Sequence, residues 1–244
     1  MNNNEKWNEE DTDLFIRYGR ILVPERDELA NHFADLIPAS RNEAFVAVDI
    51  AAGGGWLTET IVRNYPKAHV IVLDGSPGML KHTEKRLAAY AARLEFREFD
   101  LHDSSWYEDL RDTAKCFVSS LAIHHLDLQQ KQDLFKNLYE ILQQNGALLI
   151  ADIVKPAGES SRRRMSQSWD EMTKKQALEL EGHLQAYDFF LNERWNLFEY
   201  PDDPIDKPST LLEQLNAMSQ AGFSDVDVWW AKAGHALFGG YKYG

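Results

Sequence analysis

The chain has 244 residues, 44% of them hydrophobic, and its 26 Lys+Arg against 39 Asp+Glu give a formal net charge of −13. This composition is typical of a globular protein. So acidic a chain is poorly suited to neutralising nucleic-acid phosphates, although a local basic patch leaves a nucleic-acid substrate open. No apolar run approaches the roughly 20 residues that span a bilayer, and the polar, acidic start is unlike a signal peptide. With a single cysteine, Cys116, an internal disulfide is excluded. We therefore expect a cytoplasmic protein that does not associate with membranes.

Strand and helix patterns alternate from residue 45 to residue 153. Within residues 1–40 there are two short amphipathic helices. They are followed in chain order by strand 45–50, helix 56–65, strand 69–73, helix 77–92, strand 94–99, strand 116–120, helix 128–142 and strand 147–153. Strands that alternate with helices of this length are typical of a doubly wound α/β fold. We therefore predict a mostly parallel, Rossmann-like sheet.

The end of the chain departs from this alternation. After a predicted helix at 209–221, Val226, Val228 and Trp230 alternate with polar or exposed positions, and a second strand pattern begins at His235. The link of about three residues between these two strands is too short for a parallel crossover, so they form an antiparallel hairpin. The prediction is a seven-stranded sheet in a single domain, with a core formed by residues 41–155 and 209–244.

Residues 156–208 interrupt this core with a helical pattern. Their apolar residues recur at steps of three and four, which places them on one helix face: Met165, Trp169, Met172, Leu180, Leu184, Tyr187 and Leu191. The segment follows the carboxyl end of a strand, which is the edge where ligands bind in open α/β sheets. We predict a helical cap over the binding site.

The sequence Asp49-Ile-Ala-Ala-Gly-Gly-Gly55 ends the first strand, and Asp74 ends the second. Glycines between a strand and a helix let the backbone approach a ligand closely, although such a turn also occurs for structural reasons alone. Asp74 comes close to the roughly 20-residue spacing at which a carboxylate grips a ribose diol in this topology. Together these residues favour a nucleoside-containing cofactor.

This pattern resembles the class I S-adenosylmethionine-dependent methyltransferases, whose motifs match in order over residues 45–154. The resemblance implies S-adenosyl-L-methionine as the cofactor. It also implies these contacts: Asp49, Ala51, Gly53, Gly55, Asp74, Gly75, Ser76, Met79, Asp100, Leu101 and Ser119. In this interpretation Asp49 stays ionised and pairs with the cofactor's ammonium group, Asp74 binds the ribose, and Met79 packs on the adenine, whose amine donates to Asp100. The family usually has glycine where this chain has Ala51, and a methyl group fits there if φ is negative.

Candidate acceptor residues lie further along the chain. His124 and His125 follow the predicted fourth strand and either act as a general base or position the ligands. Trp169, Tyr187 and Trp195 of the cap suit an apolar or aromatic acceptor, and Arg163 belongs to a basic segment that attracts an anion or forms a solvated helix face. No arrangement with metal-ligand spacing stands out, so no metal is expected.

The predicted function is therefore in-line methyl transfer to a small, anionic or aromatic acceptor. Two other classes remain open. A nicotinamide-dependent oxidoreductase is the nearest, but its G-x-G-x-x-G pattern fails at Thr58. The other is a non-catalytic partner subunit that binds S-adenosylmethionine and turns over nothing.

Overall fold

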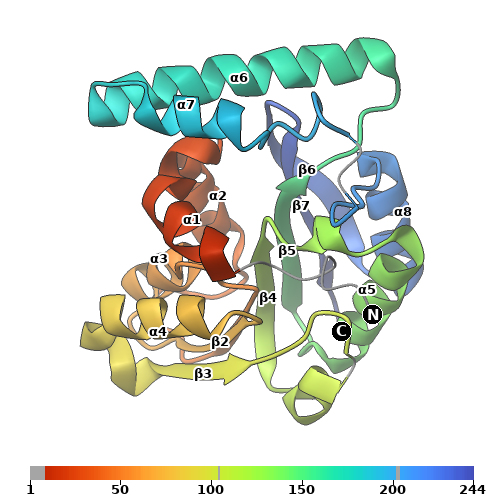
Figure 1. The fold of residues 1–244 in the computed structure, drawn as a ribbon. Coiled ribbons are helices and arrows are strands. Elements are labelled where there is room, and N and C mark those ends of the chain that lie inside the picture. The colour runs from red at the N-terminus through yellow and green to blue at the C-terminus, as the bar shows by residue number, and fades with distance from the viewer. Residues whose placement is uncertain (1–8, 104, 202–203) are drawn as a thin grey trace.

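The computed structural model describes residues 9–103, 105–201 and 204–244 (Figure 1). Its strands are β1 (Val46–Ile50), β2 (His69–Asp74), β3 (Leu94–Glu98), β4 (Ala114–Ser120), β5 (Gly146–Ile153), β6 (Ser224–Lys232) and β7 (His235–Lys242). Its α-helices are α1 (Glu9–Leu22), α2 (Arg26–Leu36), α3 (Trp56–Asn64), α4 (Pro77–Arg86), α5 (Leu128–Ile141), α6 (Glu159–Glu181), α7 (Gln185–Asn192) and α8 (Leu211–Ala221). Three short 3-10 helices are η1 (Ala88–Arg93), η2 (Ser105–Leu110) and η3 (Ile123–His125).

The seven strands form one sheet in the order β3-β2-β1-β4-β5-β7-β6. The first five are parallel, and β7 runs antiparallel to both β5 and β6. This arrangement confirms the predicted Rossmann-like sheet with an antiparallel hairpin. The strand order reverses at β1, between β2 and β4, and open α/β sheets bind their ligands at such a switch point.

One predicted helix is shorter than expected. The pattern favoured a helix over 77–92, but α4 ends at Arg86 and the chain continues as η1. The break falls at Leu87, whose side chain is buried in the same apolar cluster as Phe33 and Ile61. The 3-10 turns that follow tighten the path of the chain, so that Leu94 enters β3 beside Val70.

Helices cover both faces of the sheet. On one face, Phe33 of α2 and Ile61 of α3 pack with alternate residues of the parallel strands. On the other, Phe135 of α5 and Met218 of α8 pack against the remaining strand residues. The central strands β1 and β5 are buried on both faces and are mostly apolar, whereas the edge strands β3 and β6 are partly exposed. Asp49 of β1 and Asp152 of β5 stand out as buried carboxylates within such apolar runs.

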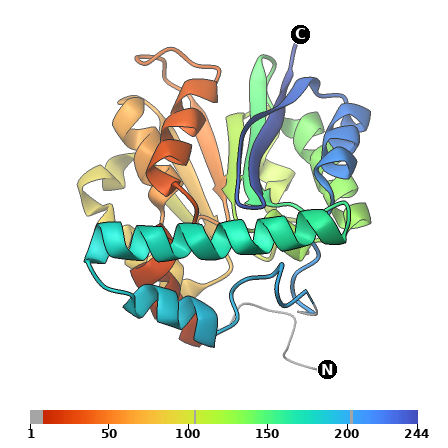
Figure 2. The ribbon, with the colours of Figure 1, turned by 90° about the horizontal axis from the view of Figure 1, so that it is seen from above.

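Helices α6 and α7 form the predicted cap region, and they pack mainly on α1. In Figure 2, α6 crosses the molecule in front of one end of the sheet, with α7 and part of α1 beside it. Tyr18 and Leu22 of α1 share a buried apolar cluster with Trp169 and Phe190 of the cap. Gln176 strengthens this junction, because its side-chain amide donates to the carbonyl oxygen of Ile21 at 2.7 Å. Within the described part of the chain, the helices are too short or too polar to cross a membrane.

Candidate cofactor and acceptor site

The glycine-rich turn between β1 and α3 requires its glycines. Gly53 and Gly55 have φ angles of +53° and +73°, in the left-handed region that glycine adopts most easily. A Cβ atom on Gly55 would lie 2.3 Å from the side chain of Thr83 in α4. Thr83 in turn donates a 2.8 Å hydrogen bond to the carbonyl oxygen of Gly53. These contacts hold the turn tightly against α4, so the path of its backbone is fixed.

Ala51 adopts a conformation that the sequence did not predict. A negative φ was the condition for accommodating its methyl group, but the structure gives φ +55°. An L-residue in this region costs roughly 1–2 kcal/mol, because its Cβ comes too close to the backbone. Ala51 is therefore a strained alanine at the position where the related family usually has glycine.

Asp49 is fully buried beneath this turn. Its Oδ2 accepts hydrogen bonds from the backbone N–H and the hydroxyl of Thr58, at 3.0 and 2.6 Å. Burial outweighs these bonds and raises the pKa of Asp49 to about 7. Its Oδ1 is buried and has no hydrogen-bond partner among the described residues. The raised pKa leaves this carboxyl only partly ionised at neutral pH in the absence of a cationic partner, and its buried, unpartnered oxygen suits a cofactor that brings an ammonium group.

Asp74 connects the end of β2 to the same turn. Its two oxygens accept hydrogen bonds from the backbone N–H groups of Gly53, at 2.7 Å, and Ser76, at 2.9 Å. Ser76 then caps α4 by accepting from the N–H of Met79 at 3.0 Å. A carboxylate oxygen can accept more than one hydrogen bond, which is the property that the predicted ribose contact requires of Asp74.

The other predicted cofactor residues occupy several environments. Met79 is buried, whereas Gly75 is exposed beside the backbone of Phe99. Asp100 is half-buried and accepts from the N–H of His102 at 3.0 Å, and its neighbour Leu101 packs against the core. The hydroxyl of Ser119 donates to the carbonyl oxygen of Ile50 at 2.9 Å, so it holds β4 to β1.

Helix α1 also reaches the cofactor region, which the sequence gave no reason to expect. The hydroxyl of Thr12 lies 3.4 Å from that of Ser76, and Phe15 lies within 3.7 Å of the position of a Cβ on Gly53. Both side chains come from an ordinary amphipathic pattern far from the motif in sequence. The sequence shows only that the helix is amphipathic, and this pattern does not reveal that the helix packs beside the glycine turn.

A cavity of about 530 Å³ opens on the outer side of the glycine turn, where Gly54 and Trp56 line it together with α1 and α2. Several arginines surround it, including Arg26, whose guanidinium lies 5.0 Å from the Trp56 ring. Asp49 and Asp74 are not among its lining residues, so the cavity is separate from the predicted cofactor contacts.

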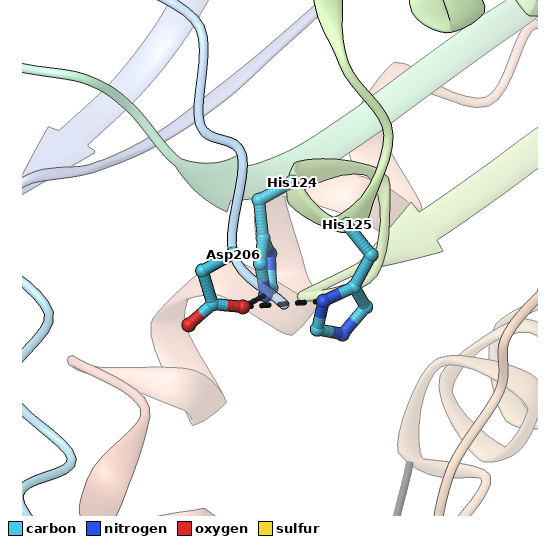
Figure 3. A group of neighbouring side chains, drawn as sticks. All are labelled: His124, His125 and Asp206. Atoms are coloured by element: carbon cyan, nitrogen blue, oxygen red, sulfur yellow. Dashed lines mark ion pairs between the residues drawn. The ribbon is translucent and has the colours of Figure 1, made fainter. Parts of the chain in front are cut away.

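His124 and His125 lie in η3, directly after β4, and both face Asp206 from the segment before α8 (Figure 3). The Nε2 of His124 and the Nδ1 of His125 lie 3.3 and 3.2 Å from the same oxygen of Asp206. On its other side, the Nδ1 of His124 lies 2.5 Å from Asp152 of β5. The backbone N–H of Lys207 donates to the carbonyl oxygen of His124 at 2.7 Å, which fixes the loop that carries Asp206.

The two histidines differ electrostatically. Burial acts to lower the pKa of His124, but the charges of Asp152 and Asp206 outweigh it and raise this pKa to about 10. Burial and the neighbouring His124 lower the pKa of His125. A proton acceptor at His124, one of the two predicted roles, does not fit this geometry, because the ring already carries its proton at neutral pH. Its contacts fit the other predicted role, positioning.

Sequence reasoning missed both aspartates of this cluster. Asp152 had a signal, since it interrupts the apolar run of β5 and is 1% exposed. Asp206 had none, because it lies in a loop far along the chain and reaches η3 only through the folded path.

Two predicted acceptor residues of the cap are engaged elsewhere. Trp169 is 3% exposed, and its Nε1 donates to the carbonyl oxygen of Leu22 at 2.9 Å, so it joins the cap to α1. The side chain of Arg163 is 73% exposed and lies 3.3 Å from Glu159 on the same helix. These positions correspond to the structural alternatives considered for them, packing and a solvated helix face.

The other two predicted acceptor residues, Tyr187 and Trp195, are only half-buried. Tyr187 is half-buried and stacks on Phe190. Trp195 is half-buried and stacks on Phe15, with ring centroids 5.9 Å apart and an interplanar angle of 17°. Since Phe15 approaches Gly53, Trp195 is the predicted acceptor residue that lies nearest to the cofactor turn through a described contact.

Comparison with known proteins agrees with this geometry. A family model described as a methyltransferase domain matches residues 47–146, which contain the glycine turn, Asp74 and η3. A solved O-methyltransferase family protein from Burkholderia thailandensis superposes with a TM-score of 0.64 at 18% identity, over 95% of this chain and 58% of that one. Residues 47–146 therefore match a methyltransferase domain, and the chain shares its fold with solved O-methyltransferases, in agreement with the resemblance found in the sequence.

Curated relatives lie within the same class. A malonyl-[acyl-carrier protein] O-methyltransferase from Halorhodospira halophila is 28% identical over 55% of this chain and 43% of its own length. A phenazine O-methyltransferase from Lysobacter antibioticus is 28% identical over 46% of this chain and 32% of its own length. The chain spans less than half of the length of these relatives.

Proposed function

We propose that this chain transfers a methyl group from S-adenosyl-L-methionine to an oxygen atom of a small acceptor. The observation that carries the proposal is the joint position of Asp49 and Asp74 around the glycine turn at Gly53. One carboxylate has a buried oxygen without a partner, and the other is oriented by two backbone donors. This pairing suits a ligand that carries both an ammonium group and a ribose diol.

The residues divide the cofactor between them. Asp49 faces the amino-acid end beneath the turn, Asp74 accepts from the ribose, and Met79 with Asp100 bounds the adenine. When bound, S-adenosylmethionine supplies a methyl group that its sulfonium charge has already activated. That carbon would pass to an acceptor oxygen that is already ionised, and the bonding pair of the carbon–sulfur bond would stay with sulfur.

For such a displacement the protein mainly holds two reactants close and in line. The acceptor is assigned to the region between η3 and the cap, where His125 and Trp195 are half-buried. Trp195 offers an apolar surface, and the half-buried His125 offers polar contact. The O-methyltransferase names of the relatives favour oxygen as the acceptor atom, and the phenazine relative favours a small aromatic acceptor.

A methyl-acceptor screen tests this proposal. The purified chain is incubated with S-adenosylmethionine and panels of small phenols, hydroxylated heteroaromatics and carboxylates, and formation of S-adenosylhomocysteine is followed by mass spectrometry. Product that appears with an acceptor and disappears in Asp74→Ala supports the proposal. If S-adenosylmethionine binds but no panel yields product, the chain is a cofactor-binding partner subunit. If NAD binds instead, the cofactor assignment itself is wrong.

A further inference from the structure

We propose that His124, His125 and Asp206 form a binding site for one divalent transition-metal ion. The sequence predicted no metal, because these three residues come together only in the fold. Each offers one ligand atom, and the three atoms lie within 4.8 Å of one another at the end of β4 (Figure 3). Two imidazoles and one carboxylate are the ligand types that zinc and neighbouring transition metals bind.

Two of the three separations between the ligand atoms match a shared ion, and all three atoms lie within 4.8 Å of one another. In a tetrahedral site with bonds of about 2.05 Å, neighbouring ligand atoms lie roughly 3.3 Å apart. The observed separations from the Asp206 oxygen are 3.3 Å to the Nε2 of His124 and 3.2 Å to the Nδ1 of His125. A single carboxylate oxygen is therefore at ligand-to-ligand distance from both rings.

The ring nitrogen of the second histidine, His125, gives a further observation. The Nδ1 of His125 is buried and forms no hydrogen bond with any residue that the structure describes, although it lies 3.2 Å from Asp206. The two atoms are close enough for a hydrogen bond but are not aligned for one. This misalignment is expected when the nitrogen and the carboxylate oxygen both point toward a metal ion between them rather than toward each other.

The surroundings of His124 complete the arrangement. Its Nδ1 lies 2.5 Å from Asp152, and the same aspartate accepts from the backbone N–H of His124 at 2.7 Å. A carboxylate that holds the far nitrogen of a ligating histidine fixes the ring and its tautomer, which is usual around zinc. It leaves Nε2, on the side of Asp206, as the ligand atom.

The backbone also holds Asp206 in place. Lys207 donates to the carbonyl oxygen of His124, and the buried ammonium group of Lys131 donates to the carbonyl oxygen of Lys207 at 2.7 Å. The ligands are therefore supported without an ion. Three protein ligands leave a further coordination position for water or an acceptor oxygen. That last role rests on the proposed methyl transfer, whereas binding of the ion does not.

Metal titration of the full chain tests the site directly. The protein is stripped with a chelator and titrated at pH 8 with Zn²⁺ by calorimetry and with Co²⁺ by visible absorption. Because the two aspartates keep His124 protonated, the ion has to displace that proton, and binding should release protons. We expect one ion to bind per chain, and we expect bound Co²⁺ to show the visible absorption of a four- or five-coordinate ion. The His125→Ala/Asp206→Ala double variant, which keeps the buried His124, should lose at least a hundredfold in affinity. Asp152→Asn should lose tenfold to a hundredfold, because the second carboxylate orients the ligand.

The matched control is His183→Ala, since His183 is an exposed cap histidine outside the cluster. It should bind both ions as the unmodified chain does. Failure of the unmodified chain to bind Zn²⁺ and Co²⁺ stoichiometrically would overturn the proposal. So would undiminished binding by a double variant whose circular dichroism shows it folded. Because these measurements need neither cofactor nor acceptor, they are independent of whether the chain transfers methyl groups.

Discussion

The carboxylate of Asp74 accepts a 2.7 Å hydrogen bond from the backbone N–H of Gly53. Asp74 ends β2 and Gly53 lies in the turn after β1, so this bond joins the two strands at their carboxyl ends. The same carboxylate is the predicted ribose acceptor. One residue therefore shapes the turn and offers the ligand contact.

Replacing Asp74 with alanine should weaken binding of S-adenosylmethionine by tenfold or more. A hydrogen bond to a charged group contributes about 1.5–3 kcal/mol, and the ribose would lose such bonds while the turn loses its anchor. Calorimetric titration measures the change. Asp133→Ala, on the exposed side of α5, is the matched control and should bind normally. Unchanged affinity in a folded Asp74→Ala protein would mean that the ribose is held elsewhere.

Binding of the cofactor should become tighter as the pH rises toward neutrality. Burial raises the pKa of Asp49 to about 7, so the carboxyl is largely protonated at pH 5.5 and largely ionised at pH 7.5. The cofactor's ammonium group favours the ionised form, so binding releases a proton below pH 7 and the affinity should rise about tenfold or more over this range.

Asp49→Asn is the control for this pH dependence. The amide oxygen still accepts from Thr58, but the side chain no longer titrates. The variant should bind the cofactor weakly and with nearly the same affinity at both pH values. A wild-type affinity that is flat between pH 5.5 and pH 7.5 would contradict the assignment of the ammonium group to Asp49.

Ala51→Gly should stabilise the protein. The position has φ +55°, where glycine is free of the strain that alanine bears, and the gain is about 0.5–1 kcal/mol after the entropic cost of glycine. For a chain of this size that is a rise of a few degrees in melting temperature. Ala52→Gly is the matched control, since Ala52 is buried without a positive φ and should lose stability. A lower melting temperature for Ala51→Gly would show that the alanine methyl group packs favourably.

Two cap tryptophans should behave differently when changed to alanine. Trp169 is buried among Phe190, Phe198 and His235, so its loss should cost about 3–5 kcal/mol of stability. Trp195 is half-buried, and losing its stack on Phe15 should cost only about 1 kcal/mol. Its main effect should be on the KM for the acceptor, with the cofactor affinity nearly unchanged. Equal KM values for Trp195→Ala and the unmodified enzyme would remove Trp195 from the acceptor site.

The sequence predicted the sheet well because its signals are local. Runs such as 147–151 are apolar throughout, since both faces of β5 are covered, and the short link between β6 and β7 permits only an antiparallel pair. The two candidate cofactor carboxylates were selected by equally local signals. Asp49 and Asp74 stand at strand ends, and parallel strands bring their ends to one edge.

Contacts between distant segments were beyond this reasoning. Asp206 reaches His124 only because its loop is pinned to η3, and no local pattern records that path. Likewise, the sequence does not distinguish whether Trp169 lines a pocket or packs in a core. Its hydrogen bond to Leu22, far away in the sequence, shows that it is packed. The conformation of Ala51 was also hidden, because composition does not reveal the sign of φ.

The most direct test of the account is a calorimetric titration of the purified chain with S-adenosylmethionine, S-adenosylhomocysteine and NAD, repeated with Asp74→Ala. The account predicts one site per chain for the first two ligands, no heat with NAD, and at least a tenfold loss in the variant. Binding of NAD in the absence of any response to S-adenosylmethionine would contradict it.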